Sequence, residues 1–146
     1  PQVVSTGLPF CIVIVKDLAV LRKAKLNLDV IDEFQSGLVH NSVQVMEPYF
    51  ATLEGATPEG DTFGRLLLAP PSPPEDPFTG SATGCVAGYL WKHGLIETPH
   101  YIAQQGHDLG RPGQAQVEVL GPRDAPTGVR VSGKGKIVMA GDMMPH

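Results

Sequence analysis

The sequence predicts an α+β domain in which mostly antiparallel strands surround one central helix, and three observations lead to this prediction. The 146 residues include 17 glycines and 14 prolines, a high share that is typical of many turns and short elements. Short apolar runs rich in β-branched residues recur along the chain, as expected for strands. One stretch that ends at Gly94 has helical spacing and many small residues, which predicts a helix enclosed by other parts of the fold.

The first third of the chain predicts a buried strand, a helical region and a second strand. Residues 10–15 are apolar and mostly β-branched, which predicts the buried strand. Asp17 can cap a helix, and apolar residues then recur at helical spacing up to Gly37, with Asn27 as a second possible cap. This region therefore reads as two short helices or one broken helix. Residues 42–50 alternate in character and predict the second strand.

The middle of the chain predicts a turn, a strand, a loop and then the enclosed helix. Residues 54–61 are polar and predict a turn, and residues 62–69 predict a strand. Residues 70–74 contain four prolines and must form an extended loop. Two glycines inside the following helix each cost about 1 kcal/mol relative to alanine. They suggest that other backbone packs closely against that helix.

The last third of the chain predicts β structure. Four strands are expected, at residues 100–103, 115–120, 128–131 and 136–140. Residues 105–113 predict a loop, and residues 132–135 predict the turn of a hairpin between the last two strands.

Charge and composition exclude several classes of protein. The formal net charge is −4 and no basic stripe is present, so we expect no binding to nucleic acid. The longest apolar run, residues 10–15, is far shorter than the ~20 residues of a membrane span, so no membrane partner is expected. Two cysteines and no visible secretory signal favour a cytoplasmic protein. Because His93, His100 and His107 fall in three different elements, no metal site is predicted.

The strongest signal for chemistry is the loop formed by residues 75–82, with the sequence Glu-Asp-Pro-Phe-Thr-Gly-Ser-Ala. This loop leads into the start of the enclosed helix, where the first N–H groups have no partner within the helix and carry partial positive charge. Such a helix end can bind a carboxylate or a phosphate. The groups predicted to bind the anion are the backbone N–H groups of Gly80, Ser81 and Ala82 and the hydroxyls of Thr79 and Ser81.

Asp76 would lie beside this anion and could hold or pass a proton. A purely structural alternative explains the same residues. In that alternative Ser81 or Thr79 only caps the helix, and Asp76 binds the amides of its own loop.

Three further side chains have both a chemical and a structural interpretation. Ser81 would be the nucleophile of a serine hydrolase if a base such as His107 lay within reach. Cys85 is either a packing residue or a nucleophile. Arg111 is either a turn residue or an anion contact.

The loop of residues 75–82 and the small-residue helix after it resemble the signature of the phenazine biosynthesis PhzF-like proteins. The resemblance extends from about residue 2 to residue 140. Four other segments that look like this family are residues 5–9, 63–65, 105–113 and 129–138.

This resemblance implies a diaminopimelate epimerase-like fold, in which two similar α+β domains each wrap strands around a central helix and the active site lies between them. It implies a cofactor-free proton shift, as in the isomerisation of trans-2,3-dihydro-3-hydroxyanthranilate. Carried over by motif, Asp76 and Ser81 become active-site residues, and the Gly80 and Ser81 amides bind the carboxylate of the substrate.

The family's acid/base glutamate and its Gly-His motif belong to the N-terminal domain, and this chain matches neither. We therefore expect residues 1–146 to be a single domain equivalent to the C-terminal half. This half would supply the carboxylate-binding helix end and Asp76 to a cofactor-independent isomerase of a small carboxylate metabolite. Its partner would be an N-terminal domain or a second copy, and it would be inactive alone. The alternative is a non-catalytic module that binds a small carboxylate or dimerises.

Overall fold

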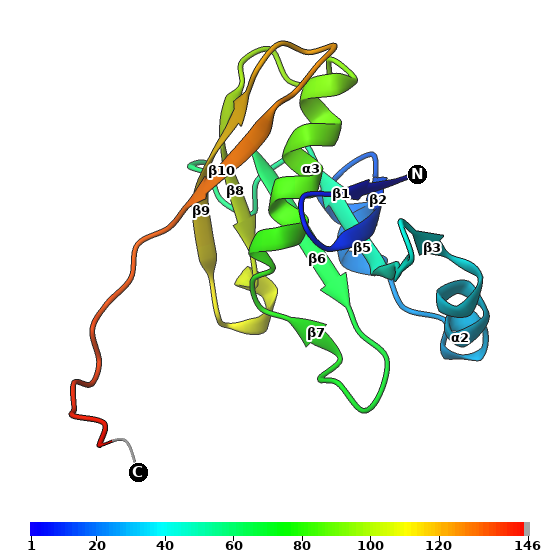
Figure 1. The fold of residues 1–146 in the computed structure, drawn as a ribbon, viewed down its shortest axis with the longest axis horizontal. Helices are drawn as coiled ribbons and strands as arrows, with labels where there is room; N and C mark the ends of the chain where they lie inside the picture. The colour runs from blue at the N-terminus through cyan, green and yellow to red at the C-terminus, as the bar shows by residue number, and fades with distance from the viewer. Residues whose placement is uncertain (145–146) are drawn as a thin grey trace.

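A computed structural model describes residues 1–144, apart from the side chains of Asp32 and Gln35. It contains one sheet that curls around a single long helix, α3 (Gly80–Lys92), as Figure 1 shows. The strands along the sheet are, in order, β1 (Gln2–Ser5), β2 (Pro9–Ile14), β5 (Met46–Thr52), β6 (Thr62–Leu67), β8 (His100–Gln105), β9 (Gly113–Leu120) and β10 (Gly128–Ser132). The short strand β7 (Glu75–Asp76) pairs with β6 off this path. The predicted α+β class with an enclosed helix is confirmed.

Most strand pairs are antiparallel, as expected, and two pairs are parallel. β2 pairs with β5 and β6 pairs with β8 in parallel, while the other neighbouring strands of this sheet run in opposite directions. Parallel neighbours need a crossover connection. The two helices of the first third lie in the first crossover, and α3 lies in the second. The helix that carries the site loop is therefore also a connection within the sheet.

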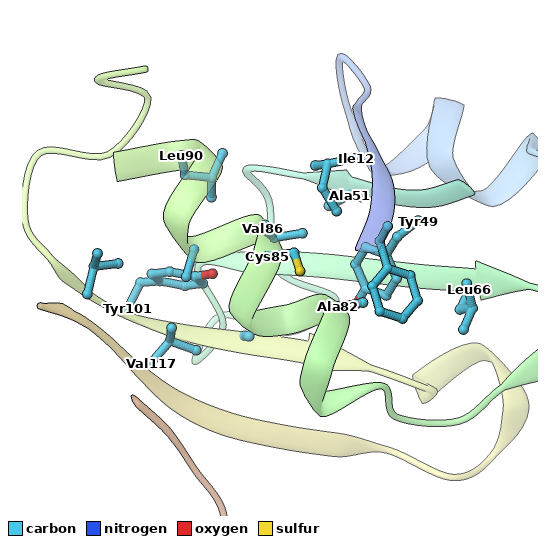
Figure 2. Packing of buried hydrophobic residues seen from close by; sticks show 14 residues of the cluster. Ile12, Tyr49, Ala51, Leu66, Ala82, Cys85, Val86, Leu90, Tyr101 and Val117 are labelled. Atoms are coloured by element: carbon cyan, nitrogen blue, oxygen red, sulfur yellow. The ribbon is translucent and has the colours of Figure 1, made fainter. Parts of the chain in front are cut away.

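The hydrophobic core lies between α3 and the concave face of the sheet (Figure 2). On α3, Ala82, Cys85 and Leu90 are completely buried. Phe10 and Ile12 of β2 and several side chains of the other strands pack against them. Burying a large apolar side chain contributes roughly 1.5–3 kcal/mol, so this core fixes where the N-terminal end of α3 lies.

The helical region of the first third consists of two helices, α1 (Leu18–Lys23) and α2 (Leu28–Gly37). Asp17 caps α1, because its carboxylate accepts a hydrogen bond of 2.8 Å from the Val20 amide. The Asn27 side chain accepts one of 3.1 Å from the Asp29 amide. Both predicted caps are confirmed.

The strand predicted over residues 42–50 is wrong in one respect, because it is interrupted. Val39–His40 (β3) and Val43–Gln44 (β4) form a separate small hairpin, and β5 begins only at Met46. Asn41 and Ser42 adopt positive φ angles of 49° and 65° at the turn between them. This left-handed turn reverses the chain, so β4 pairs with β3 instead of continuing into β5.

The hairpin predicted at the end of the chain is wrong. Residues 133–144 contain no strand, and they leave the body of the protein as an extended segment (Figure 1). Ile137, Val138 and Met139 are 87%, 90% and 85% exposed. A strand needs a neighbour, and local β-propensity alone does not form one in water. Among residues 1–144, no helix is long and apolar enough to cross a membrane.

Candidate functional site

The predicted site loop connects β7 to α3, and its first contact joins Asp76 to Thr79. The Thr79 hydroxyl donates a hydrogen bond of 2.5 Å to Oδ2 of Asp76. Thr79 occupies the N-cap position of α3, yet its side chain makes no capping bond to the helix. The structural alternative is not borne out in either part. The Asp76 carboxylate accepts from the Thr79 hydroxyl and from no amide of the described residues, and the helix end is left without a side-chain cap.

The first two residues of α3 are exposed to solvent. Gly80 and Ser81 are exposed, while Ala82 is completely buried. Within residues 1–144, no group accepts a hydrogen bond from the amides of Gly80 and Ser81. Of the three amides predicted to bind an anion, two thus belong to exposed residues and the third to a buried one.

The side chain of Gln105 supports the site loop through hydrogen bonds. The sequence indicated no role for this residue beyond its place in the segment 105–113. Its side chain is completely buried, and all its bonds go to the loop or to Tyr49. Its Oε1 accepts from the Thr79 amide at 3.0 Å and from the Tyr49 hydroxyl at 2.9 Å. Its Nε2 donates to the Asp76 carbonyl at 2.8 Å and to the Thr79 hydroxyl oxygen at 3.2 Å. Burial raises the pKa of Tyr49, so its hydroxyl stays protonated and keeps donating.

The loop after β8 packs directly against the site loop. Gly106 has a φ of 80°, and a Cβ there would collide with the carbonyl oxygens of Pro77 and Arg111. A Cβ on Gly113 would collide with the Phe78 ring. Glycine is required at these positions because the two loops approach each other so closely. Two sequence motifs about 25 residues apart are thus brought together.

The turn between β1 and β2 covers the side of α3. The Thr6 hydroxyl donates to the Ser81 carbonyl at 3.3 Å and lies 3.6 Å from the Cys85 sulfur. A Cβ on Gly84 would lie 3.2 Å from the Thr6 hydroxyl, which explains a small residue there, whereas at Gly88 nothing lies within 4 Å. The prediction that other backbone packs closely against both glycines is therefore wrong, because the neighbours of Gly84 are side chains and Gly88 has none that close. Burial raises the pKa of the Cys85 thiol, which supports packing as its role.

The remaining sequence candidates take structural positions. His107 starts a short 3-10 helix (His107–Leu109), and its ring packs edge-on against Phe63 with 5.7 Å between centroids. Arg111 is exposed, and its amide closes a turn onto the Gly106 carbonyl. Over the described residues, Ser81 and His107 share no hydrogen bond, and no three His, Cys, Asp or Glu side chains cluster as metal ligands do.

Comparison with known proteins matches the chain to one family. The model of the phenazine biosynthesis-like protein family, PhzC-PhzF, matches residues 1–141. An uncharacterized isomerase of Clostridium acetobutylicum is 30% identical over 98% of this chain and 47% of its own length. An uncharacterized isomerase of Bacillus subtilis is 31% identical over 79% of this chain and 38% of its own length. The chain spans about half the length of the curated relatives it matches.

Solved structures show the same fold. A PhzF-family phenazine biosynthesis protein of Bacillus anthracis superposes with a TM-score of 0.65 at 20% identity, covering 92% of this chain and 47% of that one. A predicted epimerase of Pseudomonas aeruginosa gives a TM-score of 0.59 at 27% identity, covering 96% and 46%. The family model matches nearly the whole sequence, and the solved structures share the fold. The match also includes the two loop motifs that the structure brings together around Gln105. The chain belongs to the phenazine biosynthesis-like PhzC-PhzF family.

Proposed function

We propose that this chain is the carboxylate-binding half of a cofactor-independent isomerase that shifts a proton on a small carboxylate metabolite. Two relatives are named isomerases and a structural neighbour is named an epimerase, which supports this reaction class. Because the chain spans about half of these proteins, a second domain completes the active site, and the main acid/base group lies there.

The observation that carries this proposal is the uncapped, exposed first turn of α3. Gly80 and Ser81 are exposed residues, and their amides carry partial positive charge at the start of α3, directly after the loop that bears Asp76. A carboxylate at this position accepts two backbone hydrogen bonds, and the Ser81 hydroxyl can donate a third.

Asp76 has the geometry of a proton-handling group next to that carboxylate. Its Oδ2 accepts the Thr79 hydroxyl, whereas its Oδ1 forms no hydrogen bond to any described residue. One oxygen is therefore fixed in direction by the protein and the other is available to a substrate. We infer that Asp76 accepts or returns a substrate proton after the second domain has closed over it.

Gly80 offers a matched pair of variants that test the binding role. Proline is well tolerated at the first position of a helix and removes one N–H group there. A Cβ at Gly80 meets nothing within 4 Å, so Gly80→Ala keeps the N–H group without a clash. We expect Gly80→Pro to weaken benzoate binding about tenfold, since a hydrogen bond to a charged group contributes ~1.5–3 kcal/mol, and Gly80→Ala to leave it unchanged.

Titration calorimetry with benzoate, and with benzamide as the uncharged control, measures this difference. Equal affinity for benzoate and benzamide, or equal affinity of the proline and alanine variants, would contradict a carboxylate site at this helix end.

Solvent deuterium exchange tests the catalytic role. We expect the chain alone to bind benzoate without exchanging any C–H of small carboxylates in D₂O. The same chain joined to its second domain should incorporate deuterium into its substrate.

Asp76→Asn should abolish that incorporation while leaving benzoate affinity within about twofold. Full incorporation by the Asp76→Asn variant would remove Asp76 from the mechanism, and binding without exchange in the completed protein would favour a binding module.

A further inference from the structure

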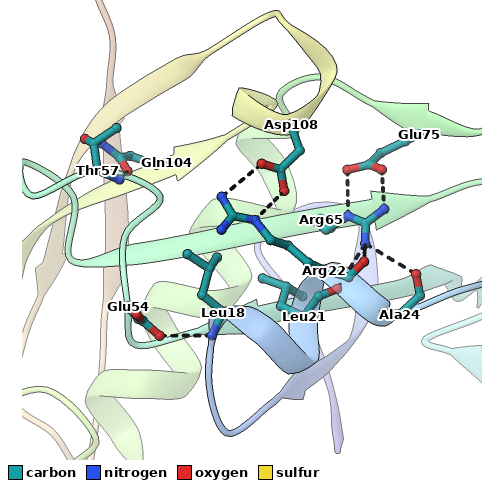
Figure 3. Close-up of polar contacts among 10 residues, drawn as sticks. All are labelled: Leu18, Leu21, Arg22, Ala24, Glu54, Thr57, Arg65, Glu75, Gln104 and Asp108. Carbon is teal, nitrogen blue, oxygen red and sulfur yellow. Dashed lines mark hydrogen bonds and ion pairs between the residues drawn. The ribbon is translucent and has the colours of Figure 1, made fainter.

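The side chain of Arg65, on β6, joins the site loop to helix α1 (Figure 3). Its Nε and Nη2 form a two-pronged ion pair with Glu75, at 3.0 and 2.6 Å. Its Nη1 donates to the carbonyls of Leu21, Arg22 and Ala24, at 3.0, 3.3 and 3.3 Å. One guanidinium thus satisfies the C-terminal carbonyls of α1 and also fixes the residue directly before Asp76.

A second ion pair connects the same helix to the other loop of the site. Arg22, in the last turn of α1, binds Asp108 with Nε–Oδ2 and Nη2–Oδ1 distances of 2.9 and 3.0 Å. Asp108 lies in the 3-10 helix two residues after Gly106, where the two loops touch. Figure 3 shows both guanidinium groups on one side of α1, each directed at a different loop.

Helix α1, which takes part in both contacts, is itself held in place by several interactions. Asp17 caps its first turn, the Glu54 carboxylate accepts from the Leu18 amide at 3.0 Å, and Leu21 is completely buried. The Arg65–Glu75 side chains are only 14% and 8% exposed, so this pair is little screened by solvent. The Arg22–Asp108 pair is 46% and 37% exposed and is weaker.

We propose that Arg65 is a positioning residue which, through Glu75 and helix α1, keeps the site loop and the loop after β8 in one fixed arrangement. The consequence for ligand binding rests on the function proposed above, whereas the mechanical coupling of the two loops does not. Arg65 acts only through Glu75 and the α1 carbonyls and touches no proposed substrate position.

Amide hydrogen exchange followed by NMR in the 146-residue chain tests the coupling. The Thr79 amide, bonded to Gln105, reports on the site loop, and the Arg111 amide, bonded to the Gly106 carbonyl, reports on the second loop. The Val119 amide, bonded to the Pro99 carbonyl, serves as the reference for global opening. We expect Arg65→Lys, which keeps the charge but loses the planar fork, to raise exchange at both loop amides at least tenfold relative to Val119.

Two further variants keep the test decisive. Arg130→Lys changes another arginine–glutamate pair, exposed Arg130 with half-buried Glu118 on the last two strands, and should leave exchange at both loop amides within about twofold of wild type. Asp108→Asn changes an exposed pair, so we expect it to cost little stability and to raise exchange at Arg111 more than at Thr79. An Arg65→Lys effect that is confined to Thr79, or that is equal at all three amides, overturns the proposal.

Benzoate affinity separates the coupling from the proposed function. Arg65→Lys should weaken benzoate at least fivefold, whereas Val119→Ala, which lowers stability in the core, should not change it. If Arg65→Lys raises exchange at both loop amides but the wild-type protein binds no benzoate, the coupling is supported and the carboxylate site is refuted. If Arg65→Lys leaves exchange at both loop amides unchanged and the wild-type protein binds benzoate, the coupling is refuted and the carboxylate site is supported.

Discussion

The two ends of helix α3 are treated in opposite ways by the rest of the molecule. At the C-terminal end, Gly94 takes a φ of 65° and its amide bonds the Trp91 carbonyl. Arg123 lies 4.1 Å from the centre of the Trp91 ring and donates to the carbonyls of Trp91 and Glu97 at 3.4 and 3.2 Å. This end is closed by a turn and a cation, as the helix dipole favours.

At the N-terminal end the surrounding groups hold the loop but leave the helix amides free. Gln105 binds the backbone on both sides of Phe78, at Asp76 and Thr79, and the Thr79 side chain turns away from the helix toward Asp76. A structural helix end is usually capped, since an N-cap side chain contributes ~0.5–2 kcal/mol. Rigid support without a cap is what a binding site for an anion requires. The contrast between the two ends supports the proposed ligand site at the first turn and a structural role at the last.

The largest loss of stability is expected from Gly106→Ala, which disrupts the contact between the loop after β8 and the loop that leads into α3. The new Cβ would meet two backbone carbonyls, and alanine at a φ of 80° is strained in addition. We expect a loss of about 4 kcal/mol in the free energy of unfolding, measured by urea denaturation. Gly110→Ala is the control, because its φ is 66° but nothing lies near its Cβ, so only the strain of about 1–2 kcal/mol remains. Equal losses would mean that the close approach of the loops is unimportant.

Gln105→Ala removes the polar support and should have the next largest effect. It leaves the buried Thr79 amide and the Tyr49 hydroxyl without their partner, at a cost of about 3 kcal/mol in unfolding free energy. It should also abolish benzoate binding at the loosened helix end. The exposed Gln116→Ala is the control and should stay within about 0.5 kcal/mol of wild type. A stable Gln105→Ala protein that binds benzoate normally would show that the loop is rigid without this side chain.

Arg123→Ala should lower stability by only about 1 kcal/mol, because it removes a cation–π contact and two hydrogen bonds at the closed end. Thermal unfolding measures this loss. Benzoate affinity should not change, since the first turn of α3 lies at the opposite end of the helix. A parallel loss of benzoate binding would argue against separate roles for the two ends.

The smallest effect is expected from nucleophile-directed reagents. Burial raises the pKa of Cys85, so at neutral pH its thiolate fraction lies below that of an exposed cysteine, and iodoacetamide should not modify it in the folded protein. A fluorophosphonate should not label Ser81, which lacks a hydrogen-bonded base among the described residues. Mass spectrometry of the folded chain and of a urea-unfolded sample checks the thiol, and labelling of Ser81 would revive the hydrolase alternative.

Local features of the sequence predicted the elements and the helix end well. Asp17, Asn27 and Gly94 have the roles expected of them because caps and stops depend on neighbouring residues. Residues 136–140 have a clear strand pattern but do not pair with the free edge of β10, so the pattern alone misled. The roles predicted for the site residues are not tested by the structure. Gly80 and Ser81 are exposed as a binding role requires, whereas the binding and catalytic roles themselves remain predictions.

The supports of the site were beyond sequence reasoning because they join residues far apart in the chain. Arg22 and Asp108 are separated by 86 positions, and Tyr49 and Gln105 by 56. No periodicity or motif relates such residues before the fold is known. The available sign was the pair of glutamines, Gln104 and Gln105, between a predicted strand and Gly106, since a polar side chain that becomes buried must find partners.

α3 is the crossover between two parallel strands, and this has a consequence for how the family evolves. A descendant that loses the Asp76 carboxylate still has to form this connection between β6 and β8 in order to fold. Selection for a chain that folds therefore preserves helix α3 and its N-terminal end, whether or not the protein still catalyses a reaction. Given the function proposed above, copies of this domain that have lost turnover should still bind anions, and new ligand specificities can arise from that binding.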